Sequence, residues 1–392
     1  MLNHYALDTL DIQKVCQTVV ERGYKPPGEP AIAVDGRWLL QLYDRNYTRT
    51  EMMIRKPVRT PCCSPNLDDF QAIGGDSMKR GEFLARVAGG AFAVSTSGAM
   101  AADGPFAGTE VEIERTQPGK PYAGKVFAAI QPHADDIPLF AGGLVLKLIE
   151  EGYTGYLIRT TNDDHTGPGT VGEGVLANER DNLAVARAFG MRKTYDLYYR
   201  NHMLDGVSPL ELRLRLIFLF RLLKVDTIVC YDPWGHYEEN PDHYATASAV
   251  EAACWMSGMA KDYPEHLDAG LSPHSVTRKY YFARGAQYVN RVVDIGDFMD
   301  RKISVNILNA AQGPAGQQGA QLRRRLTDQG LRLPLLGSDD ETANREYTRQ
   351  FVLDRDAETG KKFGLTYGEA YHYIGPAPSK VEDYIRTNAV KL

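Results

Sequence analysis

Residues 126–160 read VFAAIQPHADDIPLFAGGLVLKLIEEGYTGYLIRT, and this stretch decides the fold. It begins with an apolar run at 126–130 and ends with a second one at 156–160. Between them, 139–151 is long and apolar enough to form a partly buried helix. A strand, a helix and a second strand in this order predict a βαβ unit, in which the two strands are parallel.

The same alternation continues toward the C-terminus. We expect helices at 175–189, 209–223 and 244–256, strands at 194–198 and 226–231, and then a strand at 292–295 followed by a helix at 298–311. Alternating segments of this length predict an α/β fold with a Rossmann-like, mostly parallel sheet and helices on both faces. Ligands bind at the carboxyl ends of the strands in such sheets. The loops that begin at Gln131, Thr161 and Asp232 are therefore the ones to search for a site.

Composition narrows the class of ligand. The chain has 392 residues, of which 43% are hydrophobic, so it can bury a substantial core. Its formal net charge of -5 argues against nucleic acid or an anionic membrane surface as a partner and favours a small-molecule or oligosaccharide substrate. Five cysteines without regular spacing form neither a disulfide framework nor a four-cysteine zinc site. Any metal must therefore be held by histidine and carboxylate.

The N-terminal third lacks an identifiable chemical motif. Met78, Lys79 and Arg80, a mild apolar run and small residues near Ala102 have the order of a secretory signal peptide. We interpret 78–103 as such a segment, with a linker helix as the alternative, and 1–77 as a doubtful extension, with a helix expected at 9–22 and a strand at 38–43. Translation from Met78 would then predict export to the periplasm or the extracellular space, and translation from Met1 a cytoplasmic protein. The segment is a poor membrane span.

The loop after the first strand of the βαβ unit carries the first chemical cluster. His133 and Asp136 are three residues apart in a turn and can converge on one ion, which leaves Asp135 free as a base. Zinc accepts imidazole nitrogen and carboxylate oxygen, and a catalytic zinc keeps one position open for water. A third ligand is needed, and His243 supplies it. It follows the strand at 226–231 and opens the next helix, so it is expected at the same edge of the sheet.

These two clusters resemble the LmbE/PIG-L family of zinc-dependent N-deacetylases over about residues 125–310. The family pattern of Pro-His-Pro-Asp-Asp, Gly-Gly and a distant His-Pro-Asp-His is met by 132–136, 142–143 and 240–243. The resemblance implies that His133, Asp136 and His243 bind Zn²⁺ and that Asp135 is the catalytic base. It also implies a Rossmann-like fold and a deacetylase domain within 104–392, with an extension from about residue 312.

The chain departs from the family at the residue that would stabilise the oxyanion or protonate the leaving amine. Asn240 stands where the family often has a histidine that stabilises the oxyanion or protonates the leaving amine. With one inserted residue, Tyr237 matches a family tyrosine that polarises the substrate carbonyl, and we expect His236 as the proton donor. For both, the alternative is a loop residue that packs against Trp234. We expect Asp242 to orient a metal ligand without binding the metal itself.

Substrate contacts are expected from three places. Arg180 stands near the position of a family arginine, which Asn178 occupies here. Asn162 and Asp163 follow the second strand and are candidates for sugar hydroxyl groups, although turn formation explains them equally well. Asn240 is the fourth candidate.

The resulting expectation is a hydrolase that removes an N-acyl group, by resemblance acetyl, from an amino-sugar-containing carbohydrate. The alternative is a non-catalytic, metal-containing carbohydrate-binding protein of the same fold, which Asn240 motivates and Asp135 argues against. A nucleotide-binding Rossmann protein is disfavoured, because the first strand is followed by acidic residues instead of Gly-x-Gly-x-x-Gly.

Overall fold

A computed structural model describes residues 110–376 and 379–390, and four strands nearer the N-terminus. The chain divides into two units, Met1–Met100 and Ala101–Leu392. The first contains a sheet in the order β1-β4-β3-β2, formed by β1 (His4–Thr9), β2 (Ala31–Ile32), β3 (Trp38–Tyr43) and β4 (Arg49–Ile54). β3 confirms the strand expected at 38–43. Residues 10–22 of the expected N-terminal helix and the signal-like segment 78–103 lie outside the described residues.

The second unit is built on an eight-stranded sheet in the order β5-β11-β12-β10-β9-β6-β7-β8. Its strands are β5 (Glu112–Glu114), β6 (Val126–Gln131), β7 (Thr154–Thr161), β8 (Lys193–Tyr199), β9 (Thr227–Tyr231), β10 (Arg278–Phe282), β11 (Arg291–Asp294) and β12 (Gly368–Ile374). All pairings are parallel except those of β12, which runs antiparallel to both β10 and β11. The predicted mostly parallel α/β sheet is confirmed.

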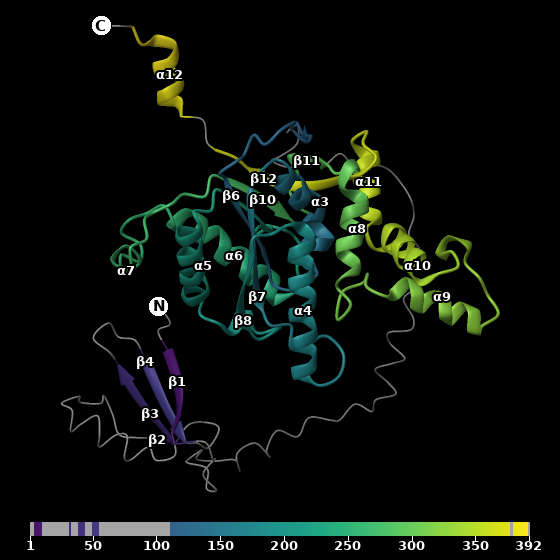
Figure 1. Ribbon diagram of the computed structural model, residues 1–392. Coiled ribbons are helices and arrows are strands. Elements are labelled where there is room, and N and C mark those ends of the chain that lie inside the picture. Colours follow the sequence, from purple (N-terminus) through teal and green to yellow (C-terminus); the bar gives the residue numbers. More distant parts are fainter. Residues whose placement is uncertain are drawn as a thin grey trace, which may run out of the picture. The chain divides into compact units, whose positions relative to one another are not determined.

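Helices cover both faces of this sheet, as predicted (Figure 1). On one face α3 (Asp136–Glu150) packs against α4 (Val171–Phe189) and α8 (Met299–Ile307), and on the other α5 (Pro209–Leu223) packs against α6 (Pro241–Met256). Helix α4 begins before the expected residue 175, because Thr170 and Glu173 form a reciprocal capping box at its start. Wholly buried side chains such as Phe127, Leu157 and Val229 form the core between these layers.

Helix α3 is interrupted at Ala141, whose φ of -141° is not helical. The carboxylate of Glu369, on β12, accepts hydrogen bonds from the Gly143 and Leu144 amides, each at 2.8 Å. It therefore caps the second half of the helix, and the buried Lys302 ammonium neutralises it at 2.8 Å. A Cβ at Gly143 would lie 2.4 Å from Ile295 Cγ2, so this close packing requires the glycine. The break separates the end of α3 that carries Asp136 from the rest of the helix.

The segment beyond residue 312 is part of the same unit, because it supplies the inner strand β12. It also contains α9 (Gln318–Asp328), α10 (Asp340–Tyr347) and α11 (Asp354–Lys362), followed by α12 (Lys380–Asn388). The remaining α-helix of the described residues is the short α7 (Glu265–Asp268). Within the described part of the chain, none of the helices has the length and apolar character that crossing a membrane requires.

Candidate metal and catalytic site

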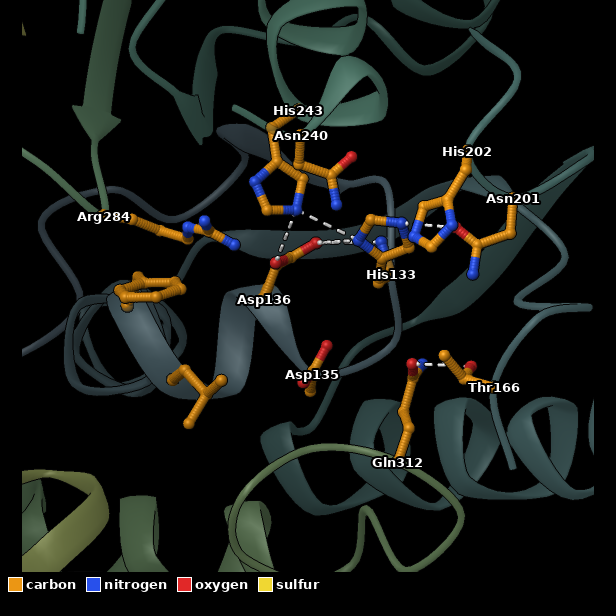
Figure 2. A pocket seen from close by; sticks show the side chains of 12 residues that line it. His133, Asp135, Asp136, Thr166, Asn201, His202, Asn240, His243, Arg284 and Gln312 are labelled. Carbon is orange, nitrogen blue, oxygen red and sulfur yellow. Dashed lines mark hydrogen bonds and ion pairs between the residues drawn. The ribbon is translucent and has the colours of Figure 1, made fainter. Parts of the chain in front are cut away.

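Three side chains converge at the carboxyl edge of the sheet. His133 follows β6, Asp136 begins α3, and His243 lies in the first turn of α6. His133 Nδ1 is 3.1 Å from His243 Nε2, and the Asp136 carboxylate lies 3.4 Å from His133 Nδ1 and 3.5 Å from His243 Nε2. Figure 2 shows the three side chains pointing toward one another. In 110–376 and 379–390 they form the one group of three or more His, Cys, Asp or Glu residues with atoms placed to share a metal ion.

Local sequence places each of these residues. The Asp136 carboxylate accepts a hydrogen bond from the His133 amide at 2.8 Å and another from the Tyr231 hydroxyl at 2.7 Å, so its orientation is set from two sides. Helix α6 begins where it does because the Asn240 side chain accepts a hydrogen bond from the Asp242 amide at 2.9 Å and Pro241 takes the first helical position. That start brings His243 to the edge of the sheet.

The outer nitrogen of each histidine also lies next to an oxygen. His133 Nε2 is 2.9 Å from Asn201 Oδ1 and 3.2 Å from Asp242 Oδ2, and His243 Nδ1 is 3.1 Å from Glu238 Oε1. A histidine that binds metal through one nitrogen usually donates the other N–H to such a partner, which sets its tautomer and ring orientation. Asp242 therefore lies where we expected it, next to the outer nitrogen of the candidate ligand His133.

The charges in the cluster shift the protonation of its members. Burial lowers the pKa of His133, but hydrogen bonds with Asp136 and Asp242 outweigh burial and raise it well above its usual range. Burial raises the pKa of Asp136, but His243 and His133 outweigh that and lower it to about 2. Two imidazole nitrogens and a carboxylate oxygen, all buried and oriented from behind, are a donor set that fits a divalent ion such as zinc.

Asp135 lies beside this cluster without joining it. Its side chain is half-buried, does not cap α3, and lines the same cavity of about 270 Å³ as the three candidate ligands. Burial, together with the negative charge of Asp136, raises the pKa of Asp135 to about 7. A carboxyl group with a pKa near neutrality is suited to taking up and returning a proton.

The rest of the cavity wall comes from several loops. Leu139 and Phe140 contribute apolar side chains to it, and the Thr166 hydroxyl, also in the wall, donates to Gln312 Oε1 at 2.9 Å. The full lining is His133, Asp135, Asp136, Leu139, Phe140, Thr166, Asn201, His202, Asn240, His243, Arg284 and Gln312. Asn240 thus reaches the cavity, although its side-chain oxygen is occupied by the cap of α6.

The roles of Tyr237 and His236 remain predictions, and neither residue lines the cavity. Tyr237 is 92% exposed and has a left-handed backbone (φ 61°), and His236 is also exposed. The His236 amide donates to the Ala286 carbonyl at 2.8 Å, which holds this part of the loop against the segment after β10. Trp234, the expected packing partner, lies instead beside Tyr281 and His372.

Three of the four predicted substrate contacts also lie outside the cavity wall. Arg180 is exposed on α4 and does not line the cavity. Asp163 is completely buried, and its carboxylate accepts from the Arg159 guanidinium at 2.8 Å, so it is a structural ion pair. Asn162 accepts a hydrogen bond from the Asp164 amide at 3.2 Å, the turn role that was its alternative, and it too is absent from the wall.

Sequence reasoning missed several residues that the fold brings to the site. Arg284 comes from the segment after β10, Asn201 and His202 from the segment after β8, and Gln312 from the region after α8. Glu238 was passed over although it lies five residues before His243 in the sequence. One signal was available: Asn201 and His202 follow a predicted strand at the edge where ligands bind, as the other loops do.

Comparisons with known proteins agree with this geometry. The family model described as PIG-L, GlcNAc-PI de-N-acetylase, matches residues 128–254. A diacetylchitobiose deacetylase from Thermococcus kodakarensis is 29% identical over 195 residues, which cover 48% of this chain and 71% of the relative. The solved structure of N,N'-diacetylchitobiose deacetylase from Pyrococcus horikoshii superposes with a TM-score of 0.52 at 24% identity, covering 64% of this chain and 84% of that one.

The structural likeness supports the fold, and the family match supports the identity of the motifs. The match spans both clusters, from within β6 to near the end of α6, the helix that carries His243. Residues 128–254 of this chain are therefore similar to the PIG-L, GlcNAc-PI de-N-acetylase, family.

Proposed function

We propose that this protein is a zinc-dependent N-deacetylase that acts on an amino-sugar-containing substrate. The observation that carries the proposal is the placement of Asp135 in one cavity with His133, Asp136 and His243. The deacetylase relatives support the reaction class, and diacetylchitobiose, named for one of them, motivates the choice of an N-acetylated sugar.

His133, Asp136 and His243 would hold the metal. A bound zinc ion supplies Lewis-acid chemistry, because it polarises a carbonyl oxygen and makes water a stronger acid. Asp135 takes the proton from the attacking water, and Asp242 and Glu238 keep the two imidazole rings in orientation through their outer nitrogens.

The size and polarity of the cavity favour a short acyl group. Leu139 and Phe140 form its apolar side, against which the methyl group of an acetyl can pack. Thr166, Asn201 and Gln312 line the cavity with polar side chains and offer candidate partners for sugar hydroxyl groups. A volume of about 270 Å³ is at the small end of ligand pockets, which suits one sugar residue more than a large aglycone.

The experiment combines metal analysis with acetate release. The purified full chain should contain one zinc per chain and release acetate from N,N'-diacetylchitobiose or N-acetylglucosamine, and a chelator should abolish release until zinc is restored. Asp135→Asn should keep the zinc and lose turnover. A protein without bound zinc, or one that releases no acyl group from a panel of N-acylated amino sugars, contradicts the proposal.

The alternative is a carbohydrate-binding protein that keeps the metal without turnover. It predicts stoichiometric zinc, measurable sugar binding and no acyl release, with Asp135→Asn leaving the affinity unchanged. The neutral Asn240 favours this alternative, and the position of Asp135 in the cavity argues against it.

A further inference from the structure

The cavity wall lacks the residues that the sequence suggested as oxyanion donor and proton donor. Asn240 is neutral and its side-chain oxygen caps α6, while Tyr237 and His236 lie outside the cavity wall. Hydrolysis of an amide places negative charge on the carbonyl oxygen, and a donor aimed at that charge is commonly the largest single contribution to catalysis. A donor from another part of this chain would add to the polarisation that a bound metal supplies.

Arg284 is the one side chain with a permanent positive charge among the residues that line the described cavity. It lies just beyond the carboxyl end of β10, and Figure 2 shows its guanidinium pointing toward Asp136 and His243. The turn that carries it is held from behind, because the Arg355 guanidinium donates to the Ala283 carbonyl at 3.2 and 3.1 Å. Arg284 is therefore aimed into the cavity by a supported backbone.

The acidic neighbours of Arg284 do not use up its hydrogen bonds. Its Nη2 is 3.3 Å from Glu239, a carboxylate side chain that is 86% exposed, and its Nε is 3.6 Å from Glu238 Oε2. The exposed pair with Glu239 is weak, the 3.6 Å separation from Glu238 Oε2 is longer than a hydrogen bond, and a guanidinium has five N–H donors. Donors remain for a ligand in the cavity.

We infer, on the basis of the proposed deacetylase function, that Arg284 is a catalytic residue that donates to the substrate carbonyl oxygen as it becomes an oxyanion. The oxygen of water bonds to the carbonyl carbon, the carbonyl π pair moves onto the oxygen facing Arg284, and the water proton passes to Asp135. Then the carbon–nitrogen bond breaks, the carbonyl re-forms, and the nitrogen leaves with a proton. The products are a carboxylic acid and an amine.

Arginine stays protonated across the working pH range and cannot serve as a general acid. In the proposed reaction Asp135, which received the proton from water, returns it to the departing amine. One carboxyl group then serves as base and acid, and the missing histidine at Asn240 is not required as a proton donor.

The test replaces the charge and then restores it. Arg284→Met should lower kcat for N,N'-diacetylchitobiose about 10²- to 10³-fold with little change in KM, the usual effect of losing an oxyanion donor. Arg284→Lys should recover part of the activity, and added guanidinium chloride should stimulate Arg284→Ala, a readout that a structural role would not move. Arg301→Met is the matched control, because Arg301 is half-exposed and makes one long ion pair with Glu150 at 3.6 Å.

Zinc content separates this role from support of the metal site through Glu238 and His243. A loss of zinc in Arg284→Met that accounts for the lost activity would overturn the inference, as would wild-type kcat in that variant. A large loss in His202→Ala together with an unaffected Arg284→Met would assign the role to His202. Failure of the wild-type chain to release acetate would instead refute the proposed function itself.

Discussion

Replacing Gly313 by alanine should displace the proposed catalytic base. A Cβ at this position would lie 3.0 Å from Asp135 Oδ2 and 3.1 Å from Asp135 Cβ. Non-bonded carbon atoms prefer about 3.5–4.0 Å, so the overlap is about half an ångström. The loop cannot easily retreat, because the Ala311 amide donates to Asp181 at 2.7 Å and Gln312 accepts from Thr166 at 2.9 Å. Asp135 should therefore move.

The expected cost follows from the size of that movement. A misplacement of 1 Å in an active site can cost about 10²-fold in rate, so half of that distance should lower kcat by about tenfold. Alanine at the left-handed φ of 86° also strains the backbone by about 1–2 kcal/mol. This strain lowers the free energy of unfolding whether or not Asp135 moves.

Gly124→Ala is the control that separates the two effects. Gly124 has φ 85° and no heavy atom within 4 Å of the place that an alanine Cβ would take, so it carries the same strain without the contact. Both variants should lose similar unfolding free energy in urea, and Gly313→Ala alone should lose kcat at unchanged zinc content. Equal kcat in the two variants would refute the account of Gly313 as the residue that makes room for Asp135.

Three further predictions concern the base, the support of the metal and the stability of the fold. Asp135→Asn should lower kcat by about 10²- to 10⁴-fold and leave zinc bound, measured by acetate release and metal analysis; substantial residual turnover would exclude Asp135 as the base. Asp242→Asn should weaken zinc binding by about 10- to 100-fold, measured by chelator competition, because Asp242 lies 3.2 Å from His133 Nε2; wild-type affinity would contradict this support. Burial raises the pKa of Glu114, but Lys147 and Arg291 outweigh it and leave the pKa below the usual 4.5. Its contribution to stability is then complete above that value and lost as the pH falls through the lowered pKa, so Glu114→Gln should flatten the acid limb of a Tm profile, and an unchanged limb would refute the assignment.

Much of the fold could be predicted because its elements are local patterns. Apolar runs and helical segments alternate along the chain, and parallel strands place the loops after β6 and β9 at one edge. That was enough to bring His133, Asp136 and His243 together. The antiparallel insertion of β12 could not be foreseen, since strand order depends on which edges meet in space.

For a related reason, the sequence did not indicate which loop side chains line the cavity. Tyr237 is close to His243 in sequence, yet the left-handed turn and the bond from His236 to Ala286 direct that segment away from the cavity. Asp163 lies in a loop at the correct edge, but the buried Arg159 holds its carboxylate. Whether a loop side chain reaches a cavity depends on its partners, which are distant in sequence.

The sequence by itself determined the α/β class, the candidate ligands His133, Asp136 and His243, and the free carboxyl group of Asp135, because spacing in a tight turn and at a helix start is a local property. Only the tertiary structure decided what surrounds them. Arg284 and Gln312 reach the cavity from segments beyond the PIG-L match, through packing of loops that no motif records. The physical reason is that backbone periodicity is encoded residue by residue, whereas the direction of a loop side chain is set by long-range hydrogen bonds and excluded volume.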